Sequence, residues 1–484
     1  MDETTDLTKK IGGIGKNYPL ITINNYHFNE SELKLFKLSS VDYLPTISLI
    51  IKTTSSIFRL RHNVLDGDTV SVYIRSNNQT FKPIKADFLI TNLTTTKSKD
   101  KEGSINTYSI DGVLHISNFF KDTCKSYKDK TSIETLINIA NDYNLGFVTQ
   151  IDGNTKQPTN KMDDKMNWLC YNEPSVVFSQ KVAQHSYWND KTFFDSWIDY
   201  HYNLNFLNIN EIVSIPDNVT LLDSVTEINW IQETGTFDKT QYAATKLLLT
   251  NSSDAQMTTQ YFNSFEINNQ ANIINSIQGY KQRLVSYSEL KTNKNEKDKR
   301  IESFERMNLK TEGAEKDKVV MLGRSGETDW ESQVRMNWLG MTRNIDNVHP
   351  NYHIAKIHNK NNLLELDKMN ITLYMPNINF SIYKGMMIQC LFFLDYDDYA
   401  IRIGGNVEDK GRQIGKSVDR SLSGNYYVKS VNYEWKQTFD FPYGQPQGIW
   451  TQEVVITRRE WTMPNSPKYI EMNNPETYPM YSPV

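Results

Sequence analysis

The hydrophobic and polar positions of this chain follow two different periods in different regions. The densest helical pattern begins at Thr131, because Thr131 and Glu134 have the spacing of a capping box. In that arrangement each side chain accepts a hydrogen bond from a backbone N–H group at the start of a helix. Apolar residues then follow at the spacing of a helix with one buried face. They are Ile133, Leu136, Ile137 and Ala140.

Further short elements are predicted after this helix. A strand is predicted at 147–151, a short apolar segment occupies 166–171, and the segment 204–209 closes the unit. A second helix is expected to begin at Pro174, since proline is favoured in the first helical turn. A third helix is expected from about Asp190. Its buried residues would be Phe193, Phe194, Trp197, Ile198 and Tyr202. Together these elements predict a compact α+β module over 126–215.

The regions on both sides of this module alternate between apolar and polar residues, which predicts strands. Val70, Val72 and Ile74 are the clearest case, and they follow a turn at Gly67. Similar alternation occupies 18–125 and 346–461, and further strand-like segments occupy 216–290. Short strands at this spacing predict an antiparallel sandwich or small barrel.

Three other stretches of the chain show no regular spacing of apolar residues. Gly12 to Lys16 contains several glycines, but Asn17 stands where a phosphate loop needs Ser or Thr, so 1–17 is predicted to be a flexible arm. Residues 291–345 are charged and dotted with glycine, which predicts a long insertion. Interleaved acidic residues argue against polyanion binding there. The range 462–484 is rich in proline and is predicted to be extended.

Composition limits the class of protein. The 484 residues suffice for two to four domains, and 38% hydrophobic residues supply their cores. A net charge of −4 gives no basic field for nucleic acid or anionic membranes. The three cysteines do not predict a disulfide framework. They are Cys124, Cys170 and Cys390. No apolar run is long enough to span a bilayer, and the acidic N-terminus does not resemble a secretory signal, so we expect synthesis in the cytoplasm.

The candidate chemical groups do not form a recognisable catalytic or metal site. His349, His353 and His358 are the densest histidine cluster, but Pro350 and the strand-like range 354–357 argue against the helix that a metal site would need. An acidic turn at Asp395, Asp397 and Asp398 lacks the residue order of a calcium loop.

Two further histidines are better explained by packing than by chemistry. His185 and His201 are expected to lie on helices beside aromatic residues. We therefore predict no catalytic, metal or cofactor-binding residue.

A weak internal repeat links the two β-rich regions. Gly67 precedes Tyr108 by 41 residues, and Gly385 precedes Tyr426 by the same 41 residues. This spacing predicts two similar antiparallel β-barrel domains with the α+β module inserted between them. The predicted organisation is an arm (1–17), a first barrel (18–125), the module (126–215), strands leading into the second barrel (216–290), the charged insertion (291–345), the second barrel (346–461) and the extended tail (462–484).

Several of these motifs resemble one protein family. They are 131–140, 168–172, 193–200, 204–208 and 423–428. Their pattern is similar to that of the baseplate hub proteins of contractile-tailed bacteriophages, which include late-control protein D and the base of type VI secretion spikes. The resemblance implies a non-enzymatic structural protein of the virion tail that needs no cofactor and no membrane.

The same resemblance implies an assembly. Such a homotrimer adapts the six-fold tail tube to a three-fold central spike and lines the DNA channel. Its implied partners are the central spike protein, tail tube or tube-initiator proteins, and other baseplate proteins, while DNA passes without specific binding.

Two other functions are compatible with the sequence. One is a tail-associated cell-wall hydrolase that uses carboxylates near Asp395 as acid and base. The other is a receptor-binding or fibre-attachment protein with an aromatic-lined sugar cleft. Aromatic residues such as Trp188 and Trp230 belong either to interfaces or to cores, and sequence alone does not separate these.

Overall fold

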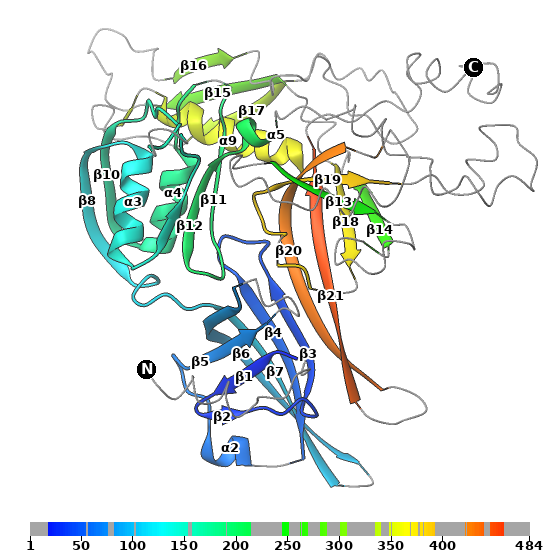
Figure 1. Ribbon diagram of the computed structural model, residues 1–484. Helices are drawn as coiled ribbons and strands as arrows, with labels where there is room; N and C mark the ends of the chain where they lie inside the picture. The colour runs from blue at the N-terminus through cyan, green and yellow to red at the C-terminus, as the bar shows by residue number, and fades with distance from the viewer. Residues whose placement is uncertain are drawn as a thin grey trace, which may run out of the picture. The chain divides into compact units, whose positions relative to one another are not determined.

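The computed structural model divides the chain into two compact units (Figure 1). It describes residues 18–54, 57–75, 82–100, 103–152, 157–189, 191–213, 244–250, 262, 264–269, 281–287, 301–306, 334–339, 348–349, 351–367, 369–375, 378–380, 382–392, 422, 424–439 and 446–458. The first unit comprises Met1–His115, Pro376–Ser381 and Asn432–Gln452, and the second comprises the remainder. The described residues are mostly antiparallel strands with few helices, which confirms the β-rich part of the predicted fold class.

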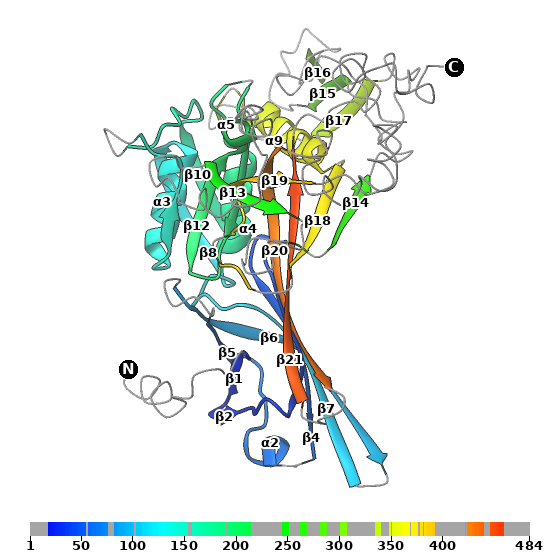
Figure 2. The same cartoon turned by 45° about the vertical axis from the view of Figure 1, so that its right-hand side comes forward.

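A single curled sheet forms the first unit, with the strand order β2-β1-β5-β6-β7-β4-β3-β20-β21. Its strands are β1 (Leu20–Ile23), β2 (Tyr26–His27), β3 (Leu33–Ser39), β4 (Thr46–Thr53), β5 (Thr69–Ile74), β6 (Ile84–Asp100), β7 (Gly103–Leu114), β20 (Gly424–Phe439) and β21 (Pro446–Thr457). The pairings from β2 round to β20 are antiparallel. The long strands β20 and β21 run side by side and contribute residues to both units (Figure 2).

The predicted alternation explains how this sheet packs. Val70, Val72 and Ile74 are at most 2% exposed, whereas Ser71 between them is exposed. On the same buried face, Phe58 of helix α2 (Ile57–Arg61) packs edge-on against Tyr108 with ring centroids 5.0 Å apart. Each strand therefore gives one apolar face to the core and one polar face to the outside.

The hairpin of β6 and β7 is longer than the alternation predicts. Its strands pair from Phe88 opposite Leu114 to Asp100 opposite Gly103. The outer part is rich in threonine and serine, whose exposed side chains give no hydrophobic signal. β-Branched threonines still favour the extended backbone, which explains why this polar stretch forms strands.

The second unit begins with two helices packed between two small sheets (Figure 1). One sheet pairs β8 with β10, and the other has the order β11-β12-β9. The elements are β8 (Asp122–Lys130), α3 (Ser132–Asp142), β9 (Gly146–Val148), β10 (Met166–Pro174), α4 (Ser175–Gln184), β11 (Phe194–Ile198), β12 (Asn203–Asn208) and α5 (Ile209–Val213). The capping box is confirmed, because Glu134 N–H donates to the Thr131 hydroxyl (3.4 Å) and Thr131 N–H donates to the Glu134 carboxylate (3.0 Å).

The third helix expected from Asp190 is wrong, because this segment forms strand β11. Phe194, Trp197 and Ile198 are all buried, so apolar residues occupy both faces of one strand rather than one face of a helix. Each residue of β11 pairs with a residue of β12. The strand ends where the Asp199 carboxylate accepts the backbone N–H groups of His201 (2.8 Å) and Asn203 (3.0 Å). This carboxylate-closed turn makes a hairpin at the place where a helix was expected.

The remaining strands of the second unit form two sheets. They are β13 (Ala244–Thr250), β14 (Ser264–Asn269), β15 (Lys281–Tyr287), β16 (Ile301–Arg306), β17 (Val334–Leu339), β18 (Met369–Met375) and β19 (Met387–Leu391). Strands β14 and β18 pair beside β21, and β19 pairs with β20 and β13. Strands β15, β16 and β17 make a separate sheet, and two of them lie within the range 291–345.

The two glycines of the internal repeat adopt the same backbone conformation. Gly67 and Gly385 have φ values of +91° and +94°, and each precedes a strand. The strands are paired differently, however, since β6 separates β5 from β7 whereas β19 pairs directly with β20. The spacing of 41 residues therefore does not mark equivalent strands.

A close backbone contact in the first unit gives a prediction for stability. A Cβ atom at Gly448 would lie 2.0 Å from the fully buried indole ring of Trp435. We expect Gly448→Ala to lower the free energy of unfolding by about 1–3 kcal/mol, because the ring or the strand must move. Chemical denaturation measures this change. Ile449→Ala is the matched control, since this neighbour is 52% exposed. Equal stability of the two variants would contradict the contact.

Candidate functional site: the polar clamp of helix α9

A buried polar network, which we call the clamp, joins helix α9 (Tyr352–Leu366) to the end of α4 through Asn359, His358, His349 and His185. Asn359 lies at its centre and is 2% exposed. Its amide nitrogen donates to the carbonyls of Gln184 (3.0 Å) and Ser186 (2.9 Å). The last carbonyls of a helix have no partner within the helix, so Asn359 satisfies groups that α4 leaves open.

The same side chain also fixes the start of β11. The Asn359 carbonyl oxygen accepts the backbone N–H of Phe194 at 3.1 Å. His358 donates from Nε2 to the carbonyl of Thr192 at 2.9 Å, and its Nδ1 lies 3.2 Å from the Asn362 amide nitrogen. Because Nε2 donates and Nδ1 accepts, the His358 ring is held as one neutral tautomer. Both ring nitrogens of His358 therefore make hydrogen bonds within the protein instead of facing a metal ion.

Two more histidines close the network at the beginning of α9. His349 donates from Nε2 to the carbonyl of His185 at 3.0 Å. His185 in turn donates from Nδ1 to the carbonyl of Tyr352 at 2.8 Å, and the two rings stack with centroids 3.7 Å apart. Trp168 covers this stack at 6.4 Å from the Tyr352 ring. The expected packing role of His185 agrees with these contacts, although the residue follows the last residue of α4.

Two sequence expectations about histidines are wrong. The range 354–357 was expected to be a strand but lies within α9. Pro350 does not prevent this helix because it precedes the first turn, where Ala355 N–H already donates to the Asn351 carbonyl at 2.8 Å. His201 does not lie on a helix but in the turn between β11 and β12. The His353 side chain lies outside the described part of the structure.

A buried carboxylate connects the starts of two segments of the same module. Asp164 is fully buried and accepts the backbone N–H groups of Ser132 (3.0 Å) and Tyr187 (3.0 Å). Ser132 is the first residue of α3, so the carboxylate satisfies one of the free donors at that helix start. Burial raises the pKa of Asp164 to about 6, and the backbone donors oppose this rise only in part.

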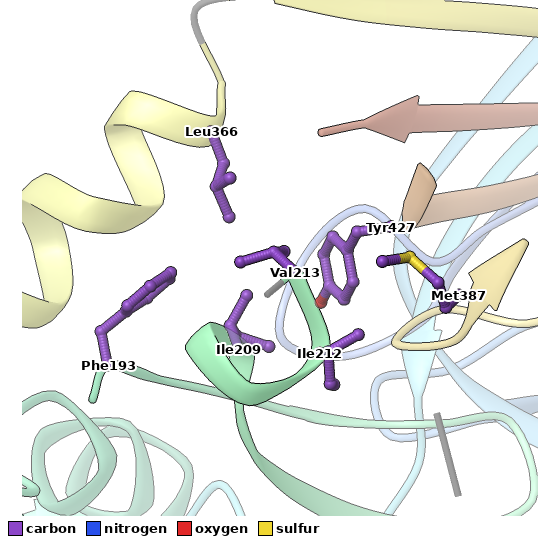
Figure 3. Close-up of a cluster of buried hydrophobic side chains, with 7 residues drawn as sticks. All are labelled: Phe193, Ile209, Ile212, Val213, Leu366, Met387 and Tyr427. Atoms are coloured by element: carbon purple, nitrogen blue, oxygen red, sulfur yellow. The ribbon is translucent and has the colours of Figure 1, made fainter. Parts of the chain in front are cut away.

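A hydrophobic cluster joins the module to the β-rich part of the second unit (Figure 3). Side chains from α5, the end of α9, β19 and β20 meet there. They are Phe193, Ile209, Ile212, Val213, Leu366, Met387 and Tyr427. The turn before β19 packs on the same module, because a Cβ atom at Gly385 would lie 2.6 Å from the Trp197 ring. Lys384 lies over that ring at 4.9 Å from its centroid.

Charged residues surround this junction. Lys429 and Asp367 form an ion pair with an N–O distance of 2.7 Å. Burial raises the pKa of Asp195, while the nearby Lys384 opposes the rise. Burial also raises the pKa of Tyr427, and the carboxylates of Asp195 and Asp367 add to the effect. These charges and the apolar cluster together hold the module against strands β19 and β20.

No group of three or more His, Cys, Asp or Glu side chains among the described residues is placed to hold a metal ion. No helix in this part of the chain is long and apolar enough to cross a membrane. The three cysteines are free, with Cys124 exposed and the other two buried. Trp188 is half-buried. Asp395, Asp397, Asp398, Trp230 and the glycine-rich arm lie outside the described residues.

Comparisons were made with known families, curated proteins and solved structures. No family and no curated protein matches the sequence. The chain is similar in structure to a tail protein from Neisseria meningitidis MC58, at 8% identity and a TM-score of 0.45 over 91% of this chain and 96% of that one. It is also similar to the 43 kDa tail protein of prophage MuSo2 from Shewanella oneidensis, at 5% identity and a TM-score of 0.46 over 91% and 98% of the two chains.

A third similar structure is the E. coli c3393 protein, a component of the type VI secretion system with structural similarity to the T4 bacteriophage tail proteins gp27 and gp5. Its identity is 8% and its TM-score 0.37, over 92% of this chain and 79% of that one. Phage tail proteins and a type VI secretion component are the groups that the sequence resemblance names. At these identities and TM-scores the similarity assigns no role to any individual residue.

The central residues of the clamp have no distinctive sequence pattern. Asn359 and Asn362 sit in a run of polar residues, and asparagine is not favoured inside helices. Only the structure shows that His358, Asn359 and Asn362 are buried and therefore need hydrogen-bond partners. Sequence alone does not indicate that these partners come from the end of a helix more than 170 residues earlier.

The clamp predicts that removing the side-chain amide of Asn359 lowers the stability of the protein strongly. Asn359→Ala removes the partners of the Phe194 N–H and of two carbonyls, so we expect the free energy of unfolding to fall by about 3 kcal/mol. Lys360→Ala is the matched control, because this neighbour in α9 is exposed. Chemical denaturation of both variants measures the difference. A loss of stability no greater for Asn359→Ala than for the control would contradict the clamp.

The buried carboxylate predicts a pH dependence. The pKa of Asp164 is raised from 3.8 to about 6, so its contribution to stability is complete below pH 3.8 and is lost as the pH rises through about 6. Between pH 4 and 7 we expect the wild type to lose about 2 kcal/mol relative to Asp164→Asn, which carries no charge at either pH. Unfolding free energies at both pH values measure this difference. The exposed Asp66→Asn control should follow the wild type, and parallel pH profiles for wild type and Asp164→Asn would refute the shift.

Proposed function

We propose that this protein is a structural hub of a contractile phage tail baseplate. In this role a homotrimer joins the six-fold tail tube to a three-fold central spike and lines the channel through which DNA passes. The proposal follows the sequence resemblance, and it needs no catalytic residue or cofactor. The observation that carries it is the polar face of the sheet in the first unit.

That face combines half-exposed side chains of both charges. Across neighbouring strands, Glu434 lies opposite Lys37, Lys37 opposite Ser48, and Ser48 opposite Asp111. All four side chains are half-buried. Opposite charges on adjacent strands are mutually favourable, and they leave no concentrated positive field. Such a row suits a surface along which a polyanion slides, because DNA binding needs clustered lysine and arginine.

The outer hairpin continues the same face with hydroxyl groups. Thr94 lies opposite Ser109, and Thr96 lies opposite Thr107. The two threonines of β6 are exposed, and their partners on β7 are half-buried. This hydroxyl ladder carries no charge, so it supports a channel wall to which a phosphate backbone does not adhere.

The sheet of the first unit also offers edges for assembly. Strand β2 is the last strand of this sheet on one side, and on the other side β18 and then β14 follow β21, so that β14 is the last strand there. Unpaired backbone groups at a sheet edge favour pairing with another chain. We propose that neighbouring copies pair at these edges, which would extend the curled sheet around the tail axis.

The symmetry of the proposal requires two similar barrel domains in each chain, as the sequence predicts at 18–125 and 346–461. Three copies would then present six such domains to six tube subunits, while the trimer itself keeps the three-fold symmetry of the spike. The further partners are tube-initiator and other baseplate proteins, and the site of action is the virion tail after synthesis in the host cytoplasm.

The assembly state tests the proposal. We expect a native mass of about 169 kDa, three times the 56.3 kDa chain mass, and trimeric rings with a central hole in negative stain. Native mass spectrometry and electron microscopy of the full chain provide both measurements. A monomer at tens of micromolar without rings would overturn the trimeric hub, and purified protein that cleaves peptidoglycan would instead support the hydrolase function.

A further inference from the structure

The outer face of the β8–β10 ribbon exposes large apolar side chains. Tyr171 is 83% exposed and Leu169 is 53% exposed. They are two residues apart on β10 and therefore project from the same face, opposite to the buried Trp168 and Cys170. Adjacent exposed apolar residues of this size mark contact surfaces rather than ordinary solvent-facing positions.

The neighbouring strand leaves room beside these side chains. Cys124 of β8 lies opposite Tyr171, and Ser126 lies opposite Leu169. Both residues are small and exposed. The Tyr171 ring therefore projects beside two small side chains. An extended peptide can bind over these small residues and pack one of its faces against the ring.

The sequence contains a segment with matching chemistry. Residues 459–484 lie outside the described part of the structure and contain prolines at 464, 467, 475, 479 and 483. The last three are spaced four residues apart. Proline favours the extended polyproline II conformation, which binds to exposed aromatic rings at a low entropic cost.

The length of the segment agrees with this pairing. An extended segment of 26 residues reaches about 80 Å from its attachment at Arg458, which suffices for binding to the same copy or to a neighbouring one.

We propose that the proline-rich segment 462–484 binds the outer face of the β8–β10 ribbon, with a proline packed on the Tyr171 ring. The contact covers the exposed side chains of Tyr171 and Leu169. It is independent of the proposed hub function, because it concerns only one segment and one surface of this chain. Binding within one copy ties the segment down, and binding to a neighbouring copy links adjacent subunits.

Site-specific crosslinking in the full chain tests this contact. A photoreactive benzoylphenylalanine replaces Tyr171, and mass spectrometry identifies the crosslinked peptides after irradiation. We expect peptides from 462–484 to dominate, in a band of either one-chain or two-chain mass. The matched control places the same probe at Leu60, which is 71% exposed in the first unit, and should give at least fivefold less of these peptides.

A second variant separates specific binding from chance proximity. Replacing Pro475, Pro479 and Pro483 together by serine removes the conformational preference and the ring contacts, so the crosslink yield at position 171 should fall at least fivefold. Circular dichroism checks that the fold is retained. Crosslinks from position 171 to other segments only, a yield equal to that from position 60, or a yield unaffected by the serine variant would each overturn the proposal.

Discussion

Buried backbone N–H and C=O groups need hydrogen-bond partners, and this requirement governs how the elements of the second unit pack. Helix α4 ends next to the buried residues His185 and Ser186, and its last carbonyls have no partner within the helix. Asn359 supplies two of these hydrogen bonds from a position 175 residues later than Gln184. Helix α9 therefore supplies hydrogen-bond partners that the module formed by 126–215 does not provide for itself.

This constraint connects local chemistry to the proposed function. A hub transmits force between a tube and a spike, so its parts must be fixed to one another without a cofactor or a disulfide. The side chains of the clamp form hydrogen bonds to backbone groups. These hydrogen bonds form only when the backbone holds the conformation that places both partners together. The apolar cluster around Tyr427 and the Lys429–Asp367 ion pair then attach the module to β19 and β20. Strand β20 also contributes Glu434 to the polar sheet face of the first unit.

Sequence periodicity predicted the parts of the fold that are governed by short-range rules. The capping box at Thr131 and Glu134 and the alternation at Val70, Val72 and Ile74 both involve neighbours within a few residues. Strand β11 was mistaken for a helix because it is buried on both faces and so has no period of two. Helix α9 was mistaken for a strand because its buried residues include His358, Asn359 and Asn362, which give no apolar stripe. Its hydrogen-bond partners are remote in sequence, and that part of the site was accessible only from coordinates.

The central claim is that the polar face of the first unit lines an axial channel in a trimer. An electron cryo-microscopy reconstruction of the assembled tail tests it most directly. It should show three copies around the axis, with Glu434, Lys37 and Asp111 facing the channel. A reconstruction with the chain away from the axis, or with this face buried against another protein and a channel lined by lysine and arginine, would contradict it.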